Sequence, residues 1–327
     1  MRKGVIYFLI TIFISGILIY FVFKKIGIRE IWEEFLSFPF LGIFLVSILT
    51  LFFVLIGIWR WKVILQYEKK NISSKDLIPL WMAGFAISYF TPFAIFGGEG
   101  AKIYYLKKNF FLPWKVGIIS VFIDKIFEVS IFFLIIILGI IFFILKTLTF
   151  PSRFWSLFLI ILFPVIALLL FYVRAFKKQS IIRLFEKPLK SFINEKATNE
   201  ISCYEEGIFD FFKTSNKNMW KVLLLSFLKG IVNWLRSWAI LWFLGIRVNG
   251  MITLSVMAFT NLSYLFPLPA ALGSHEALQV FSFSLLGLPG EKAIAFTMIL
   301  RAFDVLVATL GVLMAFRLGT KWARGKI

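Results

Sequence analysis

Two short stretches of the chain interrupt a long apolar sequence in the same way. The first, Thr91–Lys102, places Pro92 before the pair Gly97 and Gly98. Proline lacks a backbone donor and glycine loosens the backbone, so we expect a helix to end here and a new one to begin at Gly98. A broken helix at membrane depth is tolerated only where it is packed in protein or lines a wet cavity. The start of the new helix also offers free backbone N–H groups to an anion.

The second stretch, Phe266–Leu278, repeats this order of proline, apolar residues, glycine, a polar pair and alanine. Ala101 corresponds to Ala277, an offset of 176 residues (277 − 101 = 176). Apolar matches at one offset are common in so apolar a chain, but the same offset also relates charged, glycine and proline residues. These pairs are Arg60 and Arg236, Gly97 and Gly273, Pro113 and Pro289, Lys125 and Arg301, and Glu128 and Asp304. We interpret the pattern as an internal repeat.

The composition identifies the surroundings in which this repeat folds. The 327 residues are 60% hydrophobic, with a mean hydropathy of +0.90. That excludes a soluble protein and predicts an all-α polytopic membrane protein with one transmembrane domain over residues 1–327. The net charge of +19 has two readings, the basic excess of cytoplasmic loops that orients the spans, or attraction to anionic headgroups. No basic stretch forms a module of its own, so we expect no nucleic acid partner.

Signatures of enzymes and metal sites are missing from the sequence. Cys203 is the single cysteine, so no intrachain disulfide can form, and no Cys/His cluster suggests a metal site. There is also no nucleotide-binding glycine-rich loop, Walker lysine or nucleophile elbow. We therefore predict no catalytic residue, no metal and no cofactor, and we expect neither an enzyme nor an ATP-driven pump.

The charge pattern decides between two ways of threading the membrane. If Leu77–Phe96 crosses fully, the basic residues after it and the basic segment 174–221 lie outside. If residues 77–111 form a re-entrant hairpin that enters and returns on one side, both basic regions lie inside, as the positive-inside rule favours. We choose the second threading, in the cell membrane with both termini cytoplasmic. The expected segments are a first span with an interfacial helix (1–39), a first repeat (40–146) with its re-entrant hairpin (77–111), a linking span (154–173), a basic cytoplasmic linker (174–221), and a second repeat (222–317) with its hairpin (251–287).

On this threading the two repeats are inverted relative to each other in the membrane. Two discontinuous helices would then meet near the midplane, an architecture typical of transporters. The charge pattern and the repeat come from different residues, and they indicate the same arrangement.

Charged residues inside the expected spans are candidates for binding, because such charges are costly in a membrane. Lys125 and Glu128 share a helix face, as do Arg301 and Asp304, and each pair is expected to form an ion pair. Across a pseudo-twofold axis, Lys125 would instead face Asp304 and Glu128 would face Arg301. Two readings stay open: an ionic latch that fixes how the halves pack, or a cationic pocket for a phosphate.

The residues at the helix breaks have similar alternatives. Glu99 and Lys102 either cap and anchor the new helix, or meet a headgroup that approaches the glycine backbone. His275 and Glu276 hold the matching place in the second half, where a proton relay is the alternative to a structural histidine. The expected substrate-binding set is Gly97, Gly98, Glu99, Lys102, Asp124, Lys125, Glu128, Lys229, Arg236, Gly273, Ser274, His275, Glu276, Arg301 and Asp304.

These residues resemble the motifs of a known family. Pro92 followed by Gly97–Lys102 resembles the P-x-G-G-E-A-x-R box of the lysylphosphatidylglycerol synthase transmembrane family, and Pro267–Glu276 resembles its second box, P-x-P-G-G-L-G-x-x-E. The likeness covers nearly the whole chain. The departures are Lys102 for the usual Arg, Ala270-Ala271 for Gly-Gly, and an extra Gly100.

The resemblance implies a flippase-like membrane domain. In the multiple peptide resistance factors, that domain moves aminoacylated phosphatidylglycerol across the bilayer, while a separate cytosolic domain makes the lipid. The sequence ends at Ile327, shortly after the last expected span, so we do not expect aminoacyl transfer. We expect a translocator of a phosphate-bearing lipid, with membrane lipids as its partners. The alternatives are a membrane transferase using Glu99, Glu276 or Asp124 as base, or a non-transporting partner of a separate lipid synthase; a homo-oligomer is also considered.

Overall fold

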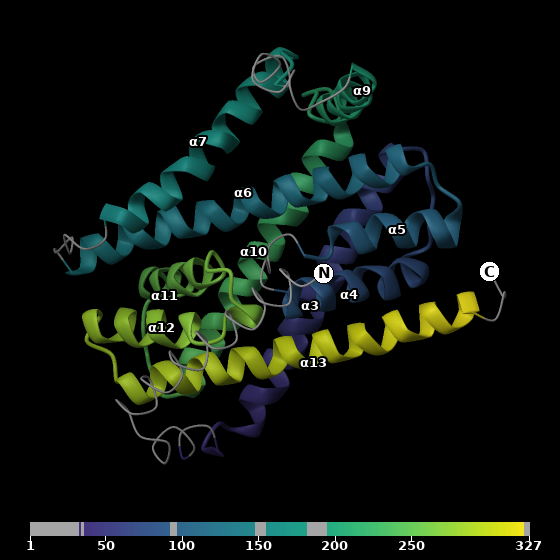
Figure 1. Cartoon of the computed structure of the whole chain (residues 1–327). Helices are drawn as coiled ribbons and strands as arrows, with labels where there is room; N and C mark the ends of the chain where they lie inside the picture. Colours follow the sequence, from purple (N-terminus) through teal and green to yellow (C-terminus); the bar gives the residue numbers. More distant parts are fainter. Residues whose placement is uncertain (1–32, 34–35, 92–96, 148–154, 182–194, 324–327) are drawn as a thin grey trace, which may run out of the picture.

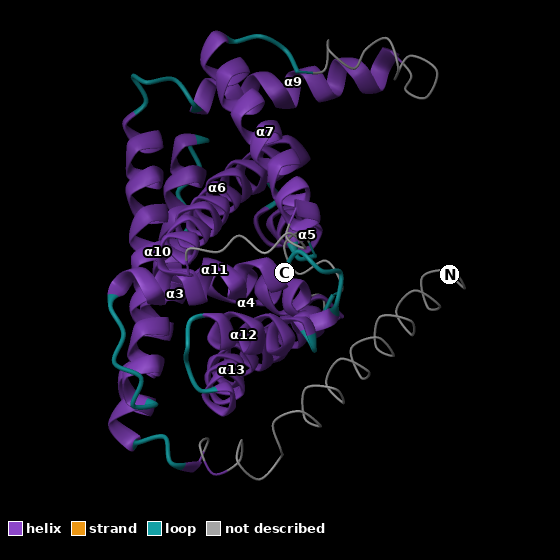
Figure 2. Cartoon of the chain, turned by 90° about the vertical axis from the view of Figure 1, so that its left-hand side faces the viewer, coloured by secondary structure: helices purple, strands orange, loops and turns teal. Residues whose placement is uncertain are grey.

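The computed structural model describes residues 33, 36–91, 97–147, 155–181 and 195–323, and this part is built from helices with no strand (Figure 1, Figure 2). Three of its helices are long and apolar enough to cross a membrane: Phe40–Tyr67, Trp114–Thr147 and Gly290–Leu318. The expected first span and almost all of the expected interfacial helix lie outside the described residues. The elements are α3 (Phe40–Tyr67), α4 (Ser74–Phe90), α5 (Glu99–Phe110), α6 (Trp114–Thr147), α7 (Trp155–Lys177), α9 (Glu195–Phe211), α10 (Lys217–Phe243), α11 (Gly250–Ser263), the 3-10 helix η2 (Pro269–Ala271), α12 (Ser274–Leu285) and α13 (Gly290–Ala323).

The helices of the first half recur in the same order in the second half. Helices α6 and α13 each have 34 residues, and both their starts and their ends differ by 176 positions (290 − 114 and 323 − 147). Helices α5 and α12 have 12 residues each, and α3 and α10 have 28 and 27. At about 1.5 Å per residue, 28 residues extend about 42 Å, more than the roughly 30 Å of a bilayer core.

The central pair of helices, α3 and α10, packs in opposite directions (Figure 1). Gly42 near the start of α3 lies against Phe243 at the end of α10. Further along α3, Arg60 reaches Ser226, which belongs to the first half of α10. The two helices thus run antiparallel through the middle of the molecule.

The longest helix of each half, α6 or α13, packs against helices of the other half. In Figure 1, α6 and α13 run in opposite directions, with α4 and α5 between them on one side and α11 and α12 on the other. Helix α6 packs on α11, where Gly139 lies against Leu254 and Ala258. Helix α13 packs on α4, where Gly311 lies against Met82. Small residues allow such close approach between helices, and this exchange joins the halves into one body.

Both helix breaks occur where the sequence predicts them. Helix α4 ends at Phe90, and α5 begins at Glu99, one residue after the expected start. The backbone N–H of Gly98 donates to Ser88 Oγ at 2.8 Å, which ties the new helix to the old one. The residues between, 92–96, lie outside the described part, and with them Pro92. In the second half, α11 ends at Ser263 and α12 begins at Ser274, with η2 between them.

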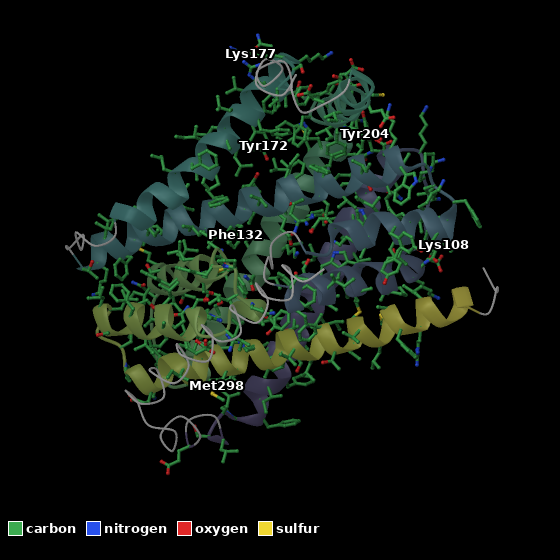
Figure 3. All side chains as sticks on the ribbon, viewed as in Figure 1. Lys108, Phe132, Tyr172, Lys177, Tyr204 and Met298 are labelled. Atoms are coloured by element: carbon green, nitrogen blue, oxygen red, sulfur yellow. The ribbon has the colours of Figure 1, made fainter. Side chains whose placement is uncertain are left out.

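The expected cytoplasmic linker is partly helical. Helix α7 continues to Lys177, one turn beyond the expected end of the linking span, and α9 covers Glu195–Phe211. Phe211 and Phe212, at the end of α9, pack on Phe127 of α6. Tyr172, labelled in Figure 3, extends from α7 toward α6 and lies 2.8 Å from Ser130 Oγ. These contacts hold the linking span and the linker against α6.

Candidate functional site

A cavity of about 230 Å³ lies between the two halves. Its wall combines residues of α3, α4, α5, α6, α10, α11 and α13. Pockets for drug-sized molecules are usually larger, about 300–1,000 Å³, so this cavity has room for a small polar group. The charged residues that line it are the basic Arg60, Lys102, Lys125, Lys229 and Arg236 and the acidic Glu99, Glu128 and Asp304.

One chain of ion pairs connects α5, α6 and α10 across the cavity. Lys125 Nζ lies 2.7 Å from Glu99 Oε1 and 2.8 Å from Glu128 Oε2. The other oxygen of Glu128, Oε1, lies 3.0 Å from Lys229 Nζ. The pairing of Lys125 with Glu128 that the sequence predicts is therefore confirmed, and the structure adds Glu99 and Lys229 to it.

A second group of charges surrounds Asp124, which lies behind the cavity wall. Arg60 Nε lies 2.7 Å from Asp124 Oδ1, and Lys102 Nζ lies 3.6 Å from Oδ2. The side chain of Asp124 is only 2% exposed. Burying an ionised carboxylate costs free energy, and here the two nearby cations offset that cost. Asp124 thus holds two of the cations that line the cavity.

Two charged residues of α13, Arg301 and Asp304, do not pair with each other. Asp304 Oδ1 lies 2.8 Å from Arg236 Nη2 on α10, and Arg301 pairs with Glu276 on α12. The predicted Arg301–Asp304 pair is therefore wrong, and so is the alternative pairing across the axis. Residues three apart share a helix face, but here each one meets an opposite charge on a different neighbouring helix.

The polar groups at the second helix break are held by contacts of their own, although Tyr264 at its start lines the cavity. Glu276 Oε2 accepts a hydrogen bond from the backbone N–H of Gly273 at 2.9 Å, as a helix cap does. Arg301 binds Glu276 and lies 3.4 Å from the carbonyls of Ala270 and Ala271. Each of these polar groups thus has a protein partner, and the break is packed.

Other polar side chains around this break are also engaged. Ser274 Oγ donates toward the carbonyls of Ser263 and Ala271, at 3.1 Å each. His275 Nε2 lies 3.4 Å from Thr260 Oγ1, and Gln279 donates to the same oxygen at 2.7 Å. Thr260 and Tyr264 both line the cavity, and the Tyr264 ring lies 6.0 Å from the His275 ring, so these two residues connect the buried network to the open space.

The predicted site residues therefore divide into two sets. Those at the cavity are Glu99, Lys102, Lys125, Glu128, Lys229, Arg236 and Asp304, with Asp124 directly behind. Those outside its lining are Gly97, Gly98, Gly273, Ser274, His275, Glu276 and Arg301. Gly98 packs closely on α4, because a Cβ added to it would collide with the backbone carbonyl of Gly84.

The aromatic wall of the cavity was not predicted from the sequence. Trp81, Phe85 and Tyr89 follow one another at i, i+4 and i+8 along α4, with ring centroids 5.7 and 6.1 Å apart. Lys229 Nζ lies 4.4 Å from the centroid of the Phe53 ring. The spacing of the three α4 aromatics was the available signal, but the same pattern also describes an ordinary packed helix face.

Phe132, labelled in Figure 3, also belongs to this wall, on α6 near the middle of the molecule. Its carbonyl accepts a hydrogen bond from Asn261 of α11 at 3.4 Å. In the described part of the chain, no group of three His, Cys, Asp or Glu side chains is placed to hold a metal ion.

Comparison with known proteins gives two matches. Residues 8–311 match the family described as the lysylphosphatidylglycerol synthase TM region. A UPF0104 membrane protein of Methanocaldococcus jannaschii is 25% identical over 316 residues, which are 92% of this chain and 91% of that protein. No solved structure matches the chain.

Proposed function

The chain belongs to the family of the lysylphosphatidylglycerol synthase TM region, and on that basis we propose that it translocates a phosphate-bearing lipid across the cell membrane. The observation that carries this proposal is the cavity between the halves, with five basic side chains in its wall. An anionic headgroup would bind these cations while its acyl chains remain in the bilayer.

The proposal includes an inverted architecture. The antiparallel pair α3 and α10 and the exchange of α6 and α13 between halves support a twofold relation about an axis in the membrane plane. On this view α4–α5 and α11–α12 are re-entrant pairs that enter from opposite sides, and both termini lie in the cytoplasm. Inverted repeats of this kind are typical of transporters that open alternately to each side.

The ion pairs serve as both latch and binding site in this proposal. Glu128 holds Lys125 on its own helix and Lys229 on α10, so it joins two helices that would have to move relative to each other. A phosphate that binds Lys229 competes with Glu128 for it. Binding of the headgroup would thereby weaken the contact between α6 and α10. In this way, occupation of the cavity would favour movement of these two helices relative to each other.

A transferase is less well supported by the geometry. Glu99, Asp124 and Glu276, the three carboxylates considered as its base, are each ion-paired with a cation. Glu276 also lies outside the cavity lining. A base held in this way is poorly placed to take a proton from a substrate in the cavity.

Translocation can be measured with purified protein in vesicles that carry fluorescent phosphatidylglycerol. We expect the protein to expose inner-leaflet lipid to a membrane-impermeant quencher faster than protein-free vesicles do. Lys229→Ala should slow this exposure, whereas Lys221→Ala, an exposed lysine on the same helix, should not.

Two results would contradict the proposal. Unchanged lipid exposure with the folded wild-type protein would favour a non-transporting partner of a lipid synthase. A covalently altered lipid, detected by mass spectrometry of the same vesicles, would favour the transferase.

A further inference from the structure

Arg60 and Arg236 occupy equivalent positions in the two halves, 176 residues apart (236 − 60). Both line the cavity, and both are almost fully buried, with 1% and 3% of the residue exposed. Each is held by one carboxylate of the long helix of its own half, Asp124 at 2.7 Å and Asp304 at 2.8 Å. Each half thus places one buried arginine, held by a carboxylate of its longest helix, in the wall of the same cavity.

Each guanidinium has donors left over after its carboxylate is bound. Arg60 Nη2 has no hydrogen-bond partner among the described residues, and the same holds for Arg236 Nε and Nη1. The hydroxyl of Tyr89, also in the cavity wall, likewise has no hydrogen-bond partner among the described residues. Buried charged donors are normally satisfied, so those that remain at a cavity indicate a ligand with several acceptor oxygens. A phosphate has this property, and a guanidinium binds it through two parallel hydrogen bonds.

The two arginines lie at different levels of the cavity. Arg60 Nη1 reaches Ser226 of α10 at 3.5 Å, so Arg60 lies at the level of that residue. Arg236 is ten residues further along α10 (236 − 226), so its backbone lies about 15 Å along the helix axis from that of Ser226, at about 1.5 Å per residue. The two arginine side chains therefore enter the cavity at different levels along α10.

Phe53 and Lys229 lie between the two levels. The centroid of the Phe53 ring is 4.4 Å from Lys229 Nζ and 5.6 Å from Arg236 Cζ. The Phe53 ring therefore holds a cation from each of two levels of α10 by cation–π attraction.

The charge balance of the cavity wall favours an anion. Five basic side chains line it, against the three acidic ones Glu99, Glu128 and Asp304. Each of these carboxylates already lies against at least one of the built-in cations. The remaining excess of positive charge therefore disfavours a headgroup with an amino group.

We propose that Arg60 and Arg236 form two phosphate subsites, occupied in turn by the headgroup of a lipid that carries a phosphate and no cationic group. This inference rests on the proposed translocation for the order of occupancy, but the two subsites themselves can be tested by binding alone.

Binding is measured on the full chain in detergent by native mass spectrometry, with phosphatidylglycerol, lysylphosphatidylglycerol and inorganic phosphate as probes. We expect phosphatidylglycerol to bind about tenfold more tightly than its lysyl ester, since one lost charge-assisted contact is worth about this factor. Arg60→Gln and Arg236→Gln should each weaken phosphatidylglycerol binding about tenfold, and the double variant should weaken it further. Lys221→Ala, exposed on α10, serves as the matched control and should bind like the wild type.

Arg60→Lys and Arg236→Lys provide a second arm that keeps the charge and the partner carboxylate paired. They should bind phosphatidylglycerol with intermediate affinity, because a lysine offers no planar pair of donors. If the glutamine variants fail to fold, these lysine variants carry the test.

Wild-type affinity in both lysine variants, or in both folded glutamine variants, would overturn the subsites. Equal binding of the lysyl ester would overturn the selectivity, and equally tight binding of inorganic phosphate would overturn the assignment to a lipid. If the variants lose binding while wild-type protein leaves vesicle lipids in place, the subsites stand and the translocation fails.

Discussion

The two helix breaks of this chain share a sequence pattern but differ in what surrounds them. At the first break, Glu99 opens α5 at the edge of a charged cavity and binds Lys125 in its wall. At the second, Glu276 caps α12 and binds Arg301 away from the cavity lining. Both breaks place an acidic residue of the new helix against a cation of the following long helix. Each half thus has an ion pair of this kind, which lines the cavity in the first half and lies outside its lining in the second.

The largest effect should come from removing the cation at the second break. Arg301→Ala leaves Glu276, which is 5% exposed, without its partner, and breaking a buried pair in this way costs about 3–5 kcal/mol of stability. Lys125→Ala should cost less, because Glu128 keeps Lys229. The Glu99 side chain, which also loses its cation, is more exposed than that of Glu276, 16% against 7%. Thermal unfolding of both variants in one detergent measures the difference. Equal loss of stability in the two variants would show that the breaks do not differ as described.

The next effect concerns the close approach of α4 and α5 at the first break. A Cβ at Gly98 would collide with the backbone carbonyl of Gly84 and with Ser88, so Gly98→Ala should destabilise the protein by about 2–3 kcal/mol. Gly100→Ala is the matched control, because no atom lies within 4 Å of its added Cβ. Both variants can be compared by thermal unfolding and by phosphatidylglycerol binding. A neutral Gly98→Ala would mean that this contact does not hold the cavity wall.

The smallest effect should come from backbone conformation at the second break. Gly273 has φ +81°, in the region that side chains avoid, so Gly273→Ala should cost about 1–2 kcal/mol. Because this residue lies outside the cavity lining, the variant should bind phosphatidylglycerol like the wild type once folded. Loss of binding with unchanged stability would assign Gly273 to the ligand site. Both helix breaks would then contribute to binding.

Several features of the fold follow from local properties of the sequence. The long apolar runs predict helices that can cross a membrane, and three described helices have that length and composition. Glycine and proline predict the ends of helices, and the breaks after Phe90 and Ser263 fall close to them. The spacing of Lys125 and Glu128 on one helix also predicts their pairing correctly. Each of these depends on neighbours in the chain.

Which charges meet across helices was decided only by the tertiary structure. Asp304 pairs with Arg236 from a different helix, 68 positions earlier in the chain, and Glu128 pairs with Lys229, 101 positions later. These contacts depend on how α6 and α13 are rotated and where they cross α10, and no local pattern encodes that. The same holds for the cavity wall, because Trp81 and Asn261 reach it only after each half packs on the other. The sequence by itself determined where helices start and stop, while packing between distant helices decided which of their polar faces remain open to a ligand.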